Sequence, residues 1–142
     1  MTENEKAYLK ECSCPEIQGL WKPKTGDNIY DKNYDKVGVV DMINVADKDC
    51  AIFVISWLDE SGSSDFTPNE STIWLPSLSQ IIAEIEKIPR LYSWNLQNST
   101  AKYPMASIFI CTHVVEVVDT TPKLAAIKAL KQVLNNDKTK KD

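Results

Sequence analysis

The segment TIWLPSLSQIIAEIEKI, residues 72–88, decides the fold because a short apolar strand ends within it and an amphipathic helix begins. Pro76 has no backbone N–H to donate to a neighbouring strand, so the strand is expected to end there. Ser77 and Gln80 have the spacing of a capping box, in which each side chain accepts a hydrogen bond from the backbone N–H of the other residue. The sequence therefore predicts a helix directly after the strand.

Five apolar residues after Ser77 recur at helical spacing and predict one buried face. They are Leu78, Ile81, Ile82, Ile85 and Ile88. Pro89 disfavours helical geometry at the residue before it, so this helix should last about three turns. A second amphipathic helix is expected from Thr121, which can cap it, with Pro122 in its first turn.

Residues 22–76 show the short apolar runs and polar turns that are typical of β-strands. We expect strands at residues 28–30, 37–45, 51–58 and 72–75. Alternation places Val40 and Met42 on the same face of the second strand. The third, AIFVISWL, is apolar almost throughout, as expected for a strand buried on both faces. Four short strands in succession predict an antiparallel β meander or a half-open barrel.

The longest apolar stretch runs from Met105 to Val118. Its content of Ile, Val, Phe and Thr favours a strand, although its periodicity fits a buried helix as well. A strand with one apolar face is expected before it, at residues 90–97.

These patterns together predict a single α+β domain in which an antiparallel sheet, with an N-terminal β meander or half-barrel, packs against two amphipathic helices. The length of 142 residues suits one domain with its own core. We divide it into an N-terminal arm (1–21), a β-rich part (22–76), a helix-strand-helix part (77–135) and a solvated tail (136–142).

The composition restricts the classes of partner. A net charge of −4 opposes general binding to nucleic acid or to anionic membrane, since both need a basic face. No apolar stretch has the length of a transmembrane helix, and the N-terminus is polar rather than signal-like. We therefore expect a cytoplasmic protein whose four cysteines are free thiols. A local basic patch is an alternative, formed by Lys22, Lys24, Lys32 and Lys36.

A metal or catalytic site would have to use the only histidine, His113. Cys12, Cys14, Cys111 and His113 could supply four zinc ligands if they converge, and the sequence leaves their convergence open. A C-x-C spacing is less usual for zinc than C-x2-C, and Cys111 lies in an apolar strand, where cysteine is an ordinary core residue. We expect no metal, no cofactor and no catalytic residues; a small enzyme using His113 and Cys111 is the weaker alternative.

The aromatic residues give a candidate binding site, because several lie at strand ends and loop edges, where they could contact another protein. The candidate aromatic edge consists of Trp21, Tyr30, Tyr34 and Trp94. The competing interpretation, which we favour for the tryptophans, places them in the core. On that interpretation Trp57 and Trp74 are the buried members.

Two segments, CPEIQGLWKPKTGDNIYD at residues 14–31 and IWLPSLSQIIAEIEK at residues 73–87, resemble small uncharacterised proteins of bacteriophages and prophages. The segment VVDTTPKLAAIKALKQVL, residues 117–134, is similar to the closing helix of the phage α-β-α sandwich domain group. The resemblance implies a phage-encoded accessory protein in the bacterial cytoplasm. It transfers no catalytic residue to this chain.

We therefore expect a non-catalytic binding or adaptor module whose partner is a protein of the host or the phage. A nucleic-acid-associated phage protein is the alternative. Pairing of two copies through an exposed sheet edge is left open.

Overall fold

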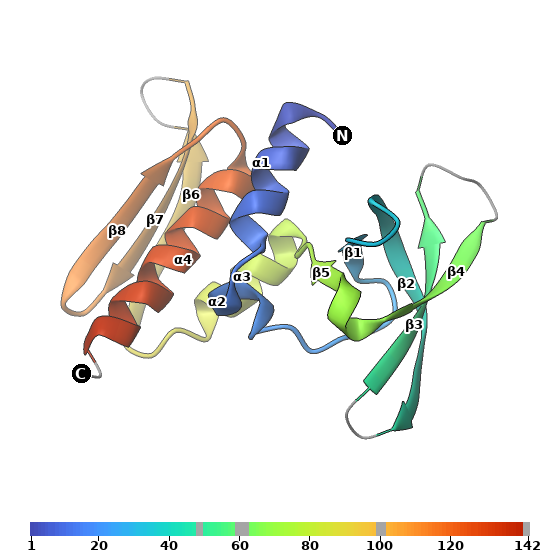
Figure 1. Ribbon diagram of the computed structural model, residues 1–142. Coiled ribbons are helices and arrows are strands. Elements are labelled where there is room, and N and C mark those ends of the chain that lie inside the picture. Colours follow the sequence, from blue (N-terminus) through green and yellow to red (C-terminus); the bar gives the residue numbers. More distant parts are fainter. Residues whose placement is uncertain (48–49, 59–62, 99–101, 141–142) are drawn as a thin grey trace. The chain divides into compact units, whose positions relative to one another are not determined.

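The computed structural model describes residues 1–47, 50–58, 63–98 and 102–140. Its contacts divide the chain into two compact units, of which the second is inserted into the first. Unit 1 contains Met1–Leu20 and Ser77–Asp142, and unit 2 contains Trp21–Pro76 (Figure 1). Antiparallel sheets occur in both units and helices in unit 1, so the predicted α+β class is confirmed. A single domain that includes both units stays a prediction.

The described part of unit 2 contains five antiparallel strands in the order β4-β3-β2-β1-β5. Their bounds are β1 Asn28–Asp31, β2 Lys36–Asp47, β3 Cys50–Trp57, β4 Ser64–Pro68 and β5 Thr72–Trp74. The first four pair in chain order and form a meander, as predicted, but the strand predicted as its fourth member is β5, which pairs with β1 instead. Strand β4 was not predicted from the sequence.

The sheet of unit 2 is curled because its two edge strands follow each other in the chain. The 3-10 turn η1, Asn69–Ser71, is the whole connection between β4 and β5. In a flat sheet, four interstrand spacings of about 4.8 Å would separate these edges by about 19 Å. The chain from Pro68 to Thr72 reaches at most about 14 Å. The strands must therefore curve toward a half-open barrel.

The inner face of this sheet forms the core of unit 2. Its buried residues are Ile29, Val40, Phe53, Ile55 and Trp57, with Trp21, Ile43 and Ala51 packed against them. The Trp21 ring stacks on Trp74 with 6.4 Å between the ring centroids and 6° between the ring planes. Trp57 and Trp74 are both buried, so their predicted core positions are confirmed.

A buried carboxylate connects the β1–β2 turn to the corner between β4 and η1. Asp31 accepts hydrogen bonds from the backbone N–H groups of Asn33 at 2.8 Å and Tyr34 at 3.0 Å. It also accepts from the Ser71 hydroxyl at 3.1 Å and from the Thr67 hydroxyl. These four donors offset the cost of removing the carboxylate from water.

A β-bulge at Asp41 decides the direction of the next side chain. Val40 pairs with Ile55, but Met42 pairs with Val54, so Asp41 has no partner residue in β3. One extra residue reverses the alternation of side chains along the strand. Val40 consequently lies in the core and Met42 on the outer face. The prediction that they share a face is wrong.

The described part of unit 1 contains a three-stranded antiparallel sheet in the order β6-β7-β8. The strands are β6 Leu91–Asn98, β7 Pro104–Ile110 and β8 His113–Val118. The stretch from Met105 to Val118 is therefore a hairpin with its turn at Cys111 and Thr112, not one strand or a buried helix. Neither turn residue has a positive φ, and neither is a typical turn former, so no local signal marked the break.

Unit 1 also contains α1 Glu3–Cys12, α2 Pro15–Gln18, α3 Leu78–Glu86 and α4 Pro122–Lys140. The predicted capping box starts α3: the Ser77 N–H donates to Gln80 Oε1 at 2.9 Å, and the Gln80 N–H donates to Ser77 Oγ at 3.2 Å. Of the five residues predicted on its buried face, Ile81, Ile85 and Ile88 are buried, and Leu78 and Ile82 are half-buried.

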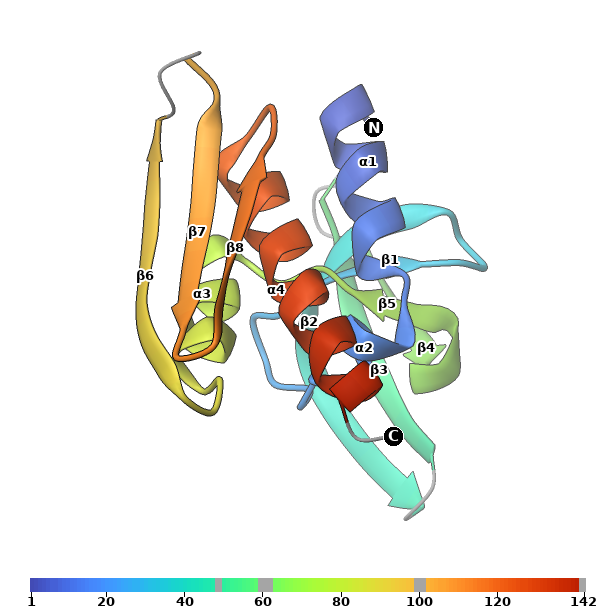
Figure 2. The same cartoon turned by 90° about the vertical axis from the view of Figure 1, so that its left-hand side faces the viewer.

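The core of unit 1 forms around α4. Figure 2 shows α3 and α4 on one face of the β6-β7-β8 sheet. The buried residues of α4 are Leu124, Ala125, Ala126, Ile127, Ala129, Leu130 and Val133. On another side α1 contacts α4, where Lys131 Nζ lies 2.7 Å from a carboxylate oxygen of Glu11. The helix continues through Lys140, into the residues predicted as a tail, because no glycine or proline stops it after Asn135.

Candidate functional site

The four residues of the candidate aromatic edge are divided between the two units. Trp21, Tyr30 and Tyr34 belong to unit 2, whereas Trp94 lies on β6 in unit 1. Trp21 is half-buried, and its Nε1–H donates to Asp27 Oδ2 at 2.9 Å. Together with its stacking on Trp74, this bond makes Trp21 part of the packing of unit 2.

Tyr30 lies in β1, and Tyr34 lies in the β1–β2 turn. The hydroxyl of Tyr30 donates to Asp35, and this hydrogen bond raises the pKa of Tyr30. The Tyr34 ring is 45% exposed and lies 5.2 Å from the Trp57 ring between centroids. Lys36 Nζ lies 5.8 Å from the centroid of the same Trp57 ring. Of the four predicted residues, Tyr34 is the one with an exposed ring.

Trp94 is half-buried and lines an apolar recess within unit 1. Ile82 and Ile85 of α3, Ala126 of α4 and Ile108 of β7 line it as well. These are the residues with which the helices pack on the sheet. Trp94 therefore contributes to the core of unit 1.

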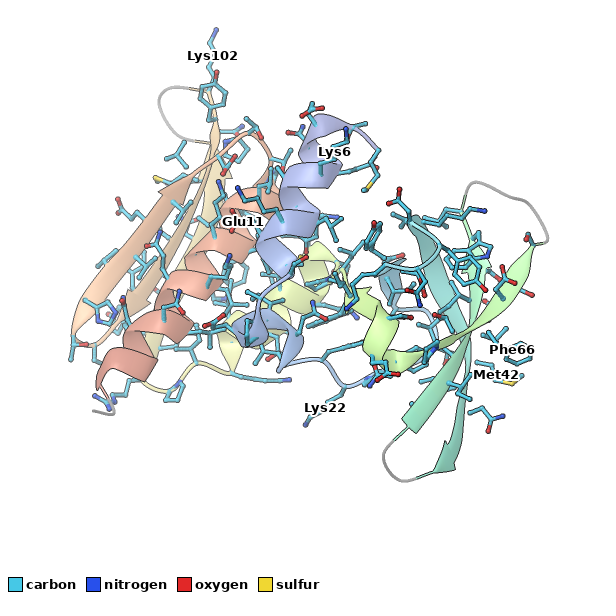
Figure 3. The ribbon with its side chains drawn as sticks, viewed as in Figure 1. Lys6, Glu11, Lys22, Met42, Phe66 and Lys102 are labelled. Atoms are coloured by element: carbon cyan, nitrogen blue, oxygen red, sulfur yellow. The ribbon has the colours of Figure 1, made fainter. Side chains whose placement is uncertain are left out.

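The sheet of unit 2 exposes two large apolar side chains, Met42 and Phe66, which were not among the predicted site residues. Val54 in β3 pairs with Met42 in β2 and with Phe66 in β4, so the three form one row across three strands. We call Met42, Val54 and Phe66 the outer apolar row. Phe66 is 70% exposed and Met42 is 59% exposed. Figure 3 shows both side chains projecting from the same side of the strands.

The outer apolar row is extended by the next row of the sheet. There Ile52 pairs with Pro68 of β4 and Asn44 of β2. The sequence predicted β3 to be buried on both faces, but the structure buries only its inner residues, Phe53, Ile55 and Trp57. Ile52 and Val54 are half-buried. A contiguous exposed apolar surface of this kind marks an interaction site more often than scattered apolar residues do.

The charge of the chain is concentrated in unit 2. Residues 21–76 contain five lysines and ten aspartates or glutamates, a formal net charge of −5 against −4 for the whole chain. Residues 50–76, which include β3, β4 and β5, have four acidic residues and no lysine, arginine or histidine. Such a charge opposes binding to nucleic acid, which is the alternative that the lysines of the first loops suggested.

Cys12 and Cys14 lie at the end of α1 and directly after it. Cys12 is buried beside Tyr8, and burial raises the pKa of its thiol to about 12. Cys14 Sγ lies 3.5 Å from the carbonyl oxygen of Glu11, to which it donates. Cys12, Cys14 and Cys111 are free cysteines.

Cys111 and His113 lie at the β7–β8 turn. Cys111 Sγ donates to the Arg90 carbonyl oxygen at 3.4 Å, and His113 Nδ1 lies 2.9 Å from the hydroxyl of Thr112. Among the residues that the structure describes, no three or more His, Cys, Asp and Glu side chains form a group that could hold a metal ion. The structure thus does not bring the four candidate ligands together.

The chain matches no protein-family model, no curated protein and no solved structure. None of the helices in the described ranges is long and apolar enough to span a membrane.

Proposed function

We propose that this chain is a non-catalytic binding module that holds a protein partner through the outer apolar row of unit 2. The exposure of Met42 and Phe66 on either side of Val54 is the observation that carries the proposal. Burying large apolar side chains at the centre of an interface supplies most of the binding free energy in protein complexes. Phe66 and Met42 are side chains of this type, and their neighbours Ile52 and Pro68 enlarge the surface.

The acidic charge of unit 2 supports a protein partner over a nucleic acid. Charged residues around an apolar centre select a partner of opposite sign and raise the rate of association. The origin of the chain as a phage or prophage accessory protein, acting in the bacterial cytoplasm, belongs to the same proposal and depends on the resemblance of residues 14–31 and 73–87.

The proposal is tested by capture from a bacterial lysate with a matched set of variants. The full chain, the double variant Met42→Ser/Phe66→Ser and the control Tyr92→Ser are immobilised, and the captured proteins are quantified. Tyr92 is a suitable control because it is 82% exposed and lies in unit 1. We expect a partner that the wild-type chain and the control retain and the double variant loses. Identical capture by all three chains would refute the proposal.

A further inference from the structure

The backbone of β4 has hydrogen-bonding groups directed away from the sheet. The Trp57 N–H donates to the Ser63 carbonyl oxygen at 3.2 Å, so these two residues form a hydrogen-bonded pair. Hydrogen-bonded and non-hydrogen-bonded pairs alternate along an antiparallel ladder. The pairs of Ser64 with Ser56 and of Phe66 with Val54 are therefore non-hydrogen-bonded. In such pairs the N–H and C=O groups of Ser64 and Phe66 point away from β3.

These outward groups lie on an edge of the sheet, since β4 is the last strand in the order β4-β3-β2-β1-β5. Native proteins usually protect an edge with lysine, proline or a bulge. In β4 two residues are of this kind, Pro68 at its end and the inward-pointing Asp65, whose carboxylate accepts from Trp57 Nε1–H. Neither occupies the outward N–H and C=O groups of Ser64 and Phe66, which are left open to pairing. An added strand would therefore continue the outer apolar row beyond Phe66.

The two faces of β4 next to this edge differ in chemistry. Phe66 is exposed on the outer face, while Asp65 is on the inner face, where the Trp57 Nε1–H donates to its carboxylate at 2.7 Å. An added strand alternates in the same way, so an apolar side chain would lie beside Phe66 and the next side chain beside Asp65. Because residues 50–76 carry only negative charge, the residues of the added strand next to its apolar ones should be basic.

We propose that β4 binds an extended segment of a partner protein, in which apolar and basic residues alternate, as a further strand of the sheet. This inference rests on the proposed function and names the class of partner. Main-chain hydrogen bonds to Ser64 and Phe66 supply affinity, and the apolar side chain beside Phe66 and the lysine or arginine beside Asp65 supply specificity.

The test uses three labelled synthetic peptides with the full chain. In the first, valine and lysine alternate; the second is the same peptide with its valine backbone nitrogens methylated; in the third, glutamate replaces lysine. Fluorescence anisotropy measures the affinity, and amide hydrogen exchange measures the protection of the Ser64 and Phe66 N–H groups. We expect the first peptide to bind and to protect both amides, and the other two to bind at least about ten-fold more weakly.

Two variants separate the backbone contribution from the side-chain contribution. Ser64→Pro removes one outward N–H, which an edge strand tolerates, and should weaken the first peptide about five-fold. Met42→Ser/Phe66→Ser removes the apolar row and should weaken it about ten-fold or more. Tyr92→Ser should bind as the wild-type chain does.

Three results would overturn the inference: no binding of the first peptide at millimolar concentration, equal binding of the methylated peptide, or unprotected Phe66 and Ser64 amides in the complex. Protection of these amides without peptide, in a chain that sediments as a dimer, would assign the edge to a second copy instead. If one of these results occurs while the double variant still loses its captured partner, strand addition fails and the proposed function stands. If the double variant captures the same proteins as the wild-type chain, the proposed function and the strand-addition inference both fail.

Discussion

Met42 and Phe66 lie on opposite sides of Val54 in a single row across β2, β3 and β4, and both are more than half exposed. The bulge at Asp41 turns Met42 to this face, and the pairing of β4 brings Phe66 to it. Because both side chains are mostly exposed, their apolar surface should contribute to binding rather than to folding.

Replacing these two residues should therefore leave the protein stable. We expect Met42→Ser and Phe66→Ser each to change the free energy of unfolding by less than about 0.5 kcal/mol, as at other exposed positions. Phe53→Ala, on the buried face of the same sheet, should cost about 3–5 kcal/mol. Urea denaturation measures all three. A loss of several kcal/mol for Phe66→Ser would mean that its side chain belongs to a core.

Asp31 should be essential for unit 2, because its removal takes the acceptor from the backbone N–H groups of Asn33 and Tyr34 and breaks its hydrogen bonds with Thr67 and Ser71. We expect Asp31→Ala to cost about 3–5 kcal/mol and Asp31→Asn, which keeps a carbonyl oxygen, to cost less. Denaturation followed by tryptophan fluorescence in a Trp94→Phe background reports unit 2 alone, since the other three tryptophans belong to it. Equal costs for the two substitutions would contradict this role.

Gly38 should not accept a side chain. A Cβ at this position would lie 2.3 Å from Ile55 Cγ2 and 2.9 Å from the Ser56 carbonyl oxygen. Gly38→Ala should therefore destabilise the protein by about 1–3 kcal/mol through overpacking. In a double-mutant cycle with Ile55→Ala, the double variant should lose less stability than the sum of the losses in the two single variants. The reason is that Ile55→Ala removes the atom nearest to the new Cβ. Strict additivity would show that the side chain of Ile55 is not the obstacle.

Arg90 has a backbone conformation that favours glycine, with φ of 64° two residues after Ile88. Arg90→Gly should stabilise unit 1 by about 0.5–1 kcal/mol, since glycine adopts this conformation without steric cost. Arg90→Ala keeps the unfavourable φ and serves as the control, for which we expect no gain. Thermal and urea unfolding measure the stability of both variants. A similar gain in Arg90→Ala would show that loss of the arginine charge, and not the backbone conformation, causes the stabilisation.

The stability of unit 1 should fall at alkaline pH. Burial raises the pKa of Cys12 from its ordinary value of 9.0 to about 12, and burial also raises the pKa of Tyr8. The folded state then keeps protons that the unfolded state has lost, so stability is complete below about pH 9 and declines toward pH 12. Urea denaturation at increasing pH should show a shallower decline for Cys12→Ala than for wild type. Cys111→Ala, at an exposed turn, should decline as wild type does.

Local signals predicted α3 well. Its capping box, its apolar stripe and the proline after it all lie within one short segment, and each acts on the backbone next to it. The same holds for the start of α4, where the Leu124 N–H donates to Thr121 Oγ1 at 3.1 Å. The apolar run of β3 predicted a strand but not that only one of its faces is buried.

The polarity of β4 is the reverse of the usual pattern, and this explains why the sequence did not reveal it. Its inward residues are Asp65, bonded to Trp57, and Thr67, bonded to Asp31, whereas its outward residue is Phe66. Their partners are distant in sequence, so the segment has the composition of a loop. The bulge at Asp41 has no sequence signal of its own either. The outer apolar row depends on both features and could not be predicted.

The stacking of Trp21 on Trp74 has a consequence for the way unit 2 is inserted into the chain. These two residues stand at the first and nearly the last positions of unit 2, so the two ends of unit 2 lie close together. Deleting residues 21–76 and joining Leu20 to Ser77 by a short glycine-serine linker should leave unit 1 able to fold. Unit 2 should in turn fold when it is inserted into a surface loop of an unrelated protein.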